Sequence, residues 1–230
     1  RGLVGSEMCI RDSGHTAPVK NSKEALKISN KIGYPVLLKA SAGGGGKGMR
    51  IVRKNSELEE NFNAAKSESK KSFGDDRVFI EKYIEQPRHI EIQILCDKHG
   101  NQVHLGEREC SIQRRYQKVI EECPSPFVDE EMRNEMAAQA LTLAKEVKYD
   151  SAGTVEFVVD ANKNFYFLEM NTRLQVEHPV SELVTGVDLV EQMIYCADNK
   201  KLNISQKDIN LKGWSVESRI YAEDPTKDFL

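Results

Sequence analysis

Apolar residues recur at helical spacing near the start of the chain. Residues 22–31 place Ala25, Leu26 and Ile28 on one side behind a serine, and Gly33-Tyr34-Pro35 ends the pattern. The spacing therefore predicts a helix over 22–31 with Ser22 as its N-terminal cap.

Strand-like runs enclose a glycine-rich segment directly after this helix. Val36–Ala40 is a short apolar run, residues 43–48 read Gly-Gly-Gly-Gly-Lys-Gly, and Met49–Val52 is a second strand-like run. The polar stretch 56–69 is compatible with a helix, and the apolar run 78–84 predicts a buried strand. These elements predict a small α+β lobe over residues 14–84.

A larger lobe with an antiparallel sheet is predicted over residues 85–230. From Arg88 the chain alternates, with His89, Glu91 and Gln93 on one face and isoleucines on the other, as in a half-buried strand. A turn at 97–101, a returning strand at 102–105 and a long helix at 129–147 follow. The runs 154–159 and 165–170 pair as a hairpin, so the fold class is α+β.

The first 13 residues match none of these patterns. Met8–Asp12 can be back-translated into a sequence that resembles the end of a transposon used to prepare sequencing libraries. We expect residues 1–13 to be a translated adaptor with no structural role.

Composition argues against several classes of function. The net charge is -3, and Lys and Arg are scattered among acidic residues, so no nucleic-acid-binding surface is expected. The five cysteines form no C-x-x-C pair, which argues against a zinc site and favours a reducing compartment. No window approaches the roughly 20 apolar residues of a membrane-spanning helix. We expect no interaction with a membrane.

The glycine segment suits a phosphate group. It removes every Cβ at four consecutive positions, which are Gly43, Gly44, Gly45 and Gly46. Backbone N–H groups can therefore approach a polyanion closely. The segment is not a Walker A loop, because Lys47 is followed by Gly48 and not by Ser or Thr. Taken alone, it also fits a flexible hairpin.

Lys39 lies inside the apolar strand that precedes the glycines. A buried lysine requires a counter-charge, which a nucleotide phosphate would supply. A strand-end lysine whose ammonium group reaches water fits the position equally well. In combination with the glycines, a phosphate-binding lysine is the preferred interpretation.

The predicted hairpin carries the strongest chemical signal. Glu156 interrupts one apolar strand, and Glu169 and Asn171 follow the apolar run of the other. Carboxylate and amide oxygens are the ligands that Mg²⁺ takes alongside phosphates. A solvated polar face is the alternative, but it leaves many charges unpaired. If the second strand stays extended beyond Asn171, its period of two also aligns Arg173, Gln175 and Glu177.

Two further groups of charges have more than one interpretation. Residues 107–118 concentrate cations among carboxylates, which suits a small anion or an exposed ion-pair network, and charge alone favours the network. Arg219 lies within a predicted strand at 216–221, with Glu217 on the same side. That arrangement fits either structural pairing or an anion site.

Several of these segments resemble biotin carboxylases, which are ATP-grasp enzymes. The resemblance rests on residues 33–40 with the glycine loop, on 111–115 and 117–118, and above all on Glu-Met-Asn-Thr-Arg-Leu-Gln-Val-Glu-His-Pro at 169–179. It covers nearly everything from residue 14 onward. Segments 213–217 and 219–225 look most similar to the α-subunit type of propionyl-CoA carboxylase. The resemblance implies an ATP-grasp fold, with a small lid lobe packed beside the larger lobe.

The resemblance implies a site for ATP and two Mg²⁺ or Mn²⁺ ions. Lys39 and the glycine loop would hold the phosphates, and the metal ligands would be Glu156, Glu169 and Asn171. The other implied ATP contacts are Met49, Glu81, Lys82, Ile84, His89, Gln113 and Tyr116. The last of these, Tyr116, stands where the family has a histidine that contacts the ribose.

The resemblance also implies how bicarbonate and biotin are handled. The residues around bicarbonate would be Lys118, Arg173, Gln175 and Val176. Glu177 would act as the base that deprotonates bicarbonate, so that it attacks the γ-phosphate and gives carboxyphosphate. Arg219 would stabilise the biotin enolate. Catalysis is thus assigned to Glu177, Arg219, Lys118 and Arg173.

The implied function is ATP-dependent carboxylation of biotin within an acyl-CoA carboxylase, with the propionyl-CoA type favoured. The implied partners are a biotin carboxyl carrier domain in the same or another chain, a carboxyltransferase subunit and further copies of the chain. The expected location is the cytoplasm in a bacterium or the mitochondrial matrix in a eukaryote. The family's N-terminal domain and the end of its last domain are expected to be missing, so the fragment should be inactive by itself.

Two other functions stay open. Another ATP-grasp ligase, such as half of a carbamoyl-phosphate synthetase or a purine-pathway carboxylase, would share the glycine loop and the metal hairpin. The block Gln-Arg-Arg-x-Gln-Lys at 113–118 and Arg219 argue against it. The non-enzyme alternative is a truncated fragment that binds nucleotide without turnover.

Overall fold

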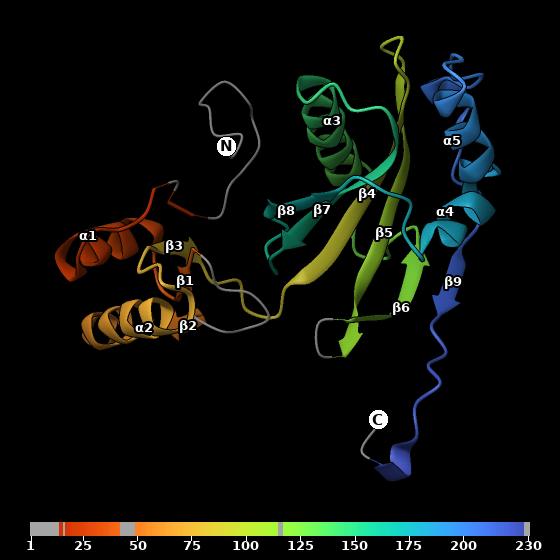
Figure 1. The fold of residues 1–230 in the computed structure, drawn as a ribbon. Helices are drawn as coiled ribbons and strands as arrows, with labels where there is room; N and C mark the ends of the chain where they lie inside the picture. Colours follow the sequence, from red (N-terminus) through yellow and green to blue (C-terminus); the bar gives the residue numbers. More distant parts are fainter. Residues whose placement is uncertain (1–13, 16, 42–48, 115–116, 228–230) are drawn as a thin grey trace. The chain divides into compact units, whose positions relative to one another are not determined.

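The chain divides into two compact units in the computed structural model, which describes residues 14, 15, 17–41, 49–114 and 117–227 (Figure 1). The first unit is Arg1–Gln86, and the second is Pro87–Leu230. The predicted adaptor at 1–13 lies outside the described residues. Among those described, no helix is both long and apolar enough to cross a bilayer.

The first unit contains a three-stranded antiparallel sheet and two helices. Its strands, in spatial order, are β2 (Met49–Val52), β1 (Val36–Ala40) and β3 (Val78–Lys82). The helices are α1 (Ser22–Ile32) and α2 (Leu58–Phe73), with the 3-10 turn η1 (Asn55–Glu57) before α2. Both strands predicted around the glycine segment are confirmed with their bounds.

The cap of α1 differs from the prediction. The side chain of Asn21 accepts a hydrogen bond from the backbone N–H of Glu24 at 3.0 Å, and Ser22 is already the first helical residue. The expected serine cap is therefore wrong. Asparagine satisfies the free N–H groups of a first turn as well as serine does.

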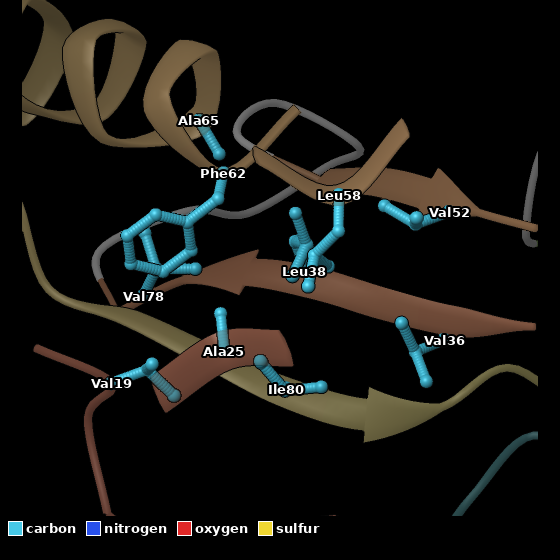
Figure 2. Close-up of a cluster of buried hydrophobic side chains, with 10 residues drawn as sticks. All are labelled: Val19, Ala25, Val36, Leu38, Val52, Leu58, Phe62, Ala65, Val78 and Ile80. Atoms are coloured by element: carbon cyan, nitrogen blue, oxygen red, sulfur yellow. The ribbon is translucent and has the colours of Figure 1, made fainter. Parts of the chain in front are cut away.

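Alternation along β1 gives this sheet one buried face. Val36 and Leu38 are fully buried, whereas Leu37 and Lys39 are only partly covered. Figure 2 shows Leu38 beneath Leu58 and Phe62 of α2. The first unit therefore has a hydrophobic core of its own, and the opposite face of its sheet carries Lys39.

The second unit is built on a six-stranded sheet in which every neighbouring pair is antiparallel. The strands, in spatial order, are β8 (Phe165–Asn171), β7 (Ser151–Val159), β4 (Arg88–Cys96), β5 (Gln102–Arg114), β6 (Gln117–Cys123) and β9 (Ser215–Ser218). The predicted α+β class is confirmed. The return strand predicted to end at Leu105 continues to Arg114, because the charged residues that follow are also part of the sheet.

Helices cover both faces of this sheet (Figure 1). One face packs against α3 (Glu130–Glu146), and the other packs against α4 (His178–Thr185) and α5 (Leu189–Ala197). The 3-10 turns η2 (Gln206–Asp208) and η3 (Pro225–Lys227) lie on either side of β9 in the sequence. β4 is consequently buried on both sides, and Glu91 and Gln93 are 0% exposed. The prediction of a half-buried strand was therefore wrong, since α4 and the segment before it cover the polar face.

A β-bulge in β5 changes which residues share a face. Ile94 is opposite His104, whereas Ile92 is opposite Glu107, so β5 gains one residue between them. Gly106 lies in this bulge with a φ of +78°, a conformation that glycine adopts without strain. Before the bulge, Val103 pairs with Leu95, and after it Arg108 comes to lie opposite Glu91.

Candidate functional site

A cleft of about 390 Å³ opens on the second unit. Every predicted site residue of this unit that the structure describes lies in its wall. These residues are His89, Gln113, Lys118, Glu156, Glu169, Asn171, Arg173, Gln175, Val176, Glu177 and Arg219. Gln117 and Tyr221 also line it and had not been assigned from the sequence.

The hairpin of β7 and β8 supplies one wall. Glu156 is the direct partner of Glu169 across the hairpin, so both carboxylates lie on the same face. β8 ends at Asn171, and residues 172–177 form turns that lead into α4. The extended alternative for 171–177 is therefore wrong. The turns bury Gln175 and Glu177 but leave Arg173 exposed.

Lys118 is the centre of the cleft's charge network. Its ammonium group contacts Glu177 at 2.7 Å and Glu156 at 3.0 Å, and it also pairs with Glu91. Its side chain is only 13% exposed. Burial by itself lowers the pKa of Lys118, but the negative charges of these carboxylates outweigh burial and raise that pKa above its ordinary value. Lys118 is therefore a permanent cation.

Glu156 collects hydrogen bonds from several sides. Its carboxylate contacts the ring of His89 at 2.6 Å and accepts from the side-chain amides of Asn171 and Gln175, each at 2.7 Å. Burial alone raises the pKa of Glu156, but the hydrogen bond with His89 and the charge of Lys118 lower it well below its usual range. Glu156 is therefore ionised at neutral pH.

Glu177 links Lys118 to Arg219. One carboxylate oxygen contacts Lys118, and the other accepts from the Arg219 guanidinium at 2.8 Å. Burial raises the pKa of Glu177, but the hydrogen bond from Lys118 and the positive charges of Lys118 and Arg108 together outweigh burial and leave that pKa below its ordinary value. Arg219 also donates to the buried Glu121 at 2.6 Å. Since β9 ends at Ser218, the prediction that Arg219 lies within a strand was wrong.

The two carboxylates of the hairpin suit a hard cation. Glu169 is exposed, and its carboxylate lies 3.5 Å from the Asn171 amide nitrogen, which also reaches Glu156. Two carboxylates therefore lie on the same side of the cleft, and carboxylate oxygens are hard donors that bind Mg²⁺ or Mn²⁺. The Asn171 side chain presents its NH₂ group to them, so its oxygen would bind the ion only with the amide reversed.

Three buried charged residues of this network were missed from the sequence. Glu91 pairs with both Lys118 and Arg108, and Glu121 pairs with Arg219. Glu91 stands between two isoleucines, as Glu156 stands between apolar residues, so the same signal was available for it. Arg108 and Glu121 have charged neighbours in the sequence and carried no such signal. The preferred interpretation of residues 107–118 as an exposed ion-pair network was wrong, because Glu107, Arg108 and Glu109 are almost fully buried.

The site residues predicted in the first unit do not all lie on one face of its sheet. Strand pairing aligns Lys39 with Met49 on one side and with Phe79 on the other, and Glu81 shares this face. The Lys39 side chain is 44% exposed and its ammonium group lies 3.8 Å from the Glu81 carboxylate, which fits the strand-end alternative, and its role as a phosphate ligand stays a prediction.

Lys82 and Ile84 complete the described part of this predicted nucleotide site. Unlike Lys39, which pairs with a carboxylate, Lys82 donates to the backbone carbonyls of Gly33 and Tyr34, at 2.9 and 3.0 Å. Ile84 lies beyond β3 in the connector and is partly buried. The glycines 43–46 and Tyr116 lie outside the described residues.

Comparison with known proteins gives this geometry its context. The family model of the carbamoyl-phosphate synthase L chain, ATP binding domain, matches residues 7–205. The chain belongs to this family. Within it, the chain is 65% identical to the propionyl-CoA carboxylase α chain of Ruegeria pomeroyi and 61% identical to the mitochondrial α chain of Homo sapiens. Each alignment covers 94% of this chain, but only 32% and 30% of the respective relative.

A protein of known structure has the same fold. The biotin carboxylase domain of 2-oxoglutarate carboxylase from Hydrogenobacter thermophilus, a dimer in complex with MgADP, ADP and bicarbonate, superposes with a TM-score of 0.80 at 52% identity. The superposition covers 96% of this chain and 49% of that one. The predicted ATP-grasp fold and the resemblance to biotin carboxylases are confirmed. The chain thus spans about a third of its curated relatives and half of the solved one.

Proposed function

We propose that the protein to which this chain belongs uses ATP and bicarbonate to carboxylate biotin, as part of an acyl-CoA carboxylase of the propionyl-CoA type. The observation that carries the proposal is the chain of contacts from Lys118 through Glu177 to Arg219, beside the paired carboxylates Glu156 and Glu169. Cations and an ionised carboxylate thus lie in one cleft with a metal-ligand set. ATP cleavage driven by a small anion needs this combination.

ATP and the metal are assigned to the hairpin and the first unit. Glu156, Glu169 and Asn171 would hold Mg²⁺ or Mn²⁺, which neutralises phosphate charge when bound. Lys39 is half-exposed and bound to Glu81 by a single contact at 3.8 Å, so its ammonium group can exchange that partner for a phosphate. His89 and Gln113 are the nucleotide contacts proposed for the second unit, and Met49, Glu81, Lys82 and Ile84 are those proposed for the first.

Bicarbonate is assigned to the centre of the cleft. Lys118, Arg173, Gln175 and Val176 would surround its oxygens, and Glu177 is ionised, as a base must be to take the bicarbonate proton. The deprotonated anion attacks the γ-phosphate, and ADP leaves. The resulting carboxyphosphate breaks into CO₂ and phosphate, and the phosphate takes the ureido proton of biotin. The biotin enolate then attacks CO₂, and Arg219 would offset the negative charge of this enolate.

The remaining proposals concern partners and location. A biotin carboxyl carrier domain, a carboxyltransferase subunit and further copies of the chain are the proposed partners. The proposed location is the cytoplasm in a bacterium and the mitochondrial matrix in a eukaryote. Two observations support these proposals. The relatives are propionyl-CoA carboxylase α chains, one of them mitochondrial, and the related biotin carboxylase domain is a dimer.

The activity can be tested in a hybrid protein. This chain would replace the matching 217 residues of the Ruegeria pomeroyi α chain, with which it is 65% identical. We expect ATP cleavage that requires both bicarbonate and biotin. Cleavage that is independent of both, in a hybrid that binds MgATP, would contradict the proposal and favour another ATP-grasp ligase.

Arg219→Ala in the same hybrid separates the proposed role of this residue from nucleotide binding. We expect biotin carboxylation to fall by about 100-fold or more, because one group that stabilises developing negative charge is lost. The dissociation constant for MgATP should stay within about twofold. Arg77→Ala is the matched control, since Arg77 is an exposed arginine of the first unit paired with Asp75. Equal losses of carboxylation and of ATP binding would refute the role.

A further inference from the structure

Arg108 is a fully buried arginine whose side chain uses all of its donors. Its Nε contacts Glu91 at 2.6 Å, and its Nη1 contacts Gln93 at 2.6 Å and Ser181 at 3.0 Å. Its Nη2 contacts Gln175 at 3.0 Å and Thr154 at 3.3 Å. These five contacts match the five N–H groups of a guanidinium. Arg108 thereby ties together β4, β7, α4 and the segment before α4.

Two of these contacts reach residues that act in the cleft. The Gln175 side-chain oxygen accepts from Arg108, so its NH₂ group is turned to Glu156, at 2.7 Å. The reversed amide would direct two donors at each other. Arg108 therefore fixes which end of Gln175 enters the cleft.

The second connection runs through Glu91. One oxygen of this carboxylate accepts from Arg108, and the other pairs with Lys118. Glu91 is 0% exposed, so without Arg108 it would be a buried carboxylate paired with Lys118 and with the His89 ring at 4.0 Å. The Arg108 Nε therefore holds one carboxylate oxygen of Glu91, which leaves the other oxygen to Lys118.

We propose that Arg108 is a positioning residue for anion binding: it orients the amide of Gln175 and, through Glu91, the ammonium group of Lys118. The inference rests on the proposed function, in which Gln175 and Lys118 contact bicarbonate. Arg108 itself has no exposed surface and touches no substrate. Its effect must therefore pass through the residues that it holds.

Arg108→Lys tests the connection to Gln175. Lysine retains a positive charge for Glu91 but lacks the fork that reaches Gln175. In the 230-residue chain, we expect the affinity for bicarbonate, measured by ¹³C NMR line broadening, to fall by about 10-fold or more, while the affinity for MgADP changes by less than about twofold. Ser181→Ala is the matched control. It removes one Arg108 contact without touching Gln175 or Glu91, so bicarbonate affinity should be unchanged.

A double-mutant cycle distinguishes positioning from a general structural role. If Arg108 acts through Gln175, then Arg108→Lys should have almost no further effect on bicarbonate affinity in a Gln175→Ala background. Additive losses, or a parallel fall in MgADP affinity, would overturn the inference. Failure of the unmodified chain to bind bicarbonate would instead overturn the proposed function, and the inference with it.

A measurement on the unmodified chain tests the inference without depending on whether any variant folds. The side-chain NH₂ of Gln175 should shift in ¹H–¹⁵N spectra when bicarbonate is added, because the hydrogen bond to Arg108 turns this group into the cleft. An unchanged Gln175 amide under saturating bicarbonate would sink the inference, whether or not Arg108→Lys folds.

Discussion

At the scale of single residues, the site depends on buried charges that compensate one another. Lys118 alone contacts three carboxylates. Arg219 pairs with Glu121 and with Glu177, which is also a partner of Lys118. Removing one partner from such a buried network leaves an uncompensated charge, which costs more than an exposed ion pair contributes. The positions of these side chains are therefore tightly coupled to folding.

The lowered pKa values of Glu156 and Glu177 predict loss of stability in acid. Because each folded-state pKa lies below the ordinary 4.5, the unfolded chain binds more protons as the pH falls. Their stabilisation is fully present above pH 4.5 and is lost as the pH falls through the folded-state values. Glu121, whose pKa is raised by burial, acts in the opposite direction.

Urea unfolding of the chain between about pH 7 and pH 3 measures this effect. We expect the free energy of unfolding to decrease on acidification, and Glu177→Gln to weaken this dependence by removing one of the two groups. A free energy of unfolding that stays constant over this pH range would contradict the lowered pKa values of the two carboxylates.

At the scale of elements, the bulge in β5 decides which residues reach the cleft. Without the extra residue, the strict period of two would keep Val103, Leu105 and Glu107 on one face. With it, Arg108 lies opposite Glu91, and Glu107 lies opposite Ile92 and binds Arg133 of α3. The extra residue at this bulge thus decides which face of the sheet each of these two ion pairs occupies.

Gly106→Ala should therefore destabilise the second unit. The φ of +78° strains any residue with a Cβ, at a cost of order 1–3 kcal/mol. The added Cβ would also lie 3.0 Å from Leu211. Gly100→Ala is the control, because its φ of +89° imposes similar strain with no atom within 4 Å. Urea unfolding should show a larger loss of unfolding free energy for Gly106→Ala than for Gly100→Ala. Equal losses would contradict a specific role of the bulge.

At the scale of the whole molecule, the predicted site residues are divided between two units, each of which has its own hydrophobic core. The core of the first unit includes Phe62 and Leu38, and the largest buried aromatic residues of the second are Phe157 and Phe165. Each unit can therefore lose stability by itself.

Phe62→Ala tests this independence. Deleting the ring should lower the unfolding free energy of the first unit by about 3–5 kcal/mol, because the surrounding side chains fill only part of the cavity that is left. Hydrogen exchange should speed up in β1 and β3 and stay unchanged in β4 and β7. Phe157→Ala, in the second unit, is the matched variant and should give the reverse pattern. Faster exchange in both units from either change would contradict separate cores.

The sequence by itself determined most of the helices and strands. Short apolar runs located β1, β2 and the hairpin. A glutamate inside an apolar run of the hairpin marked a residue of the cleft, because burying a charge without a partner is costly. The roles assigned to these residues from the resemblance stay predictions, although those described in the second unit line one cleft.

Only the tertiary structure decided which charges pair and which faces are covered. Lys118 and Glu91 are 27 residues apart, and Lys118 and Glu177 are 59 apart, so no local pattern predicts their contacts. The covered polar face of β4 was misjudged for the same reason. Periodicity tells which side chains share a face, but what packs on that face depends on elements distant in the sequence.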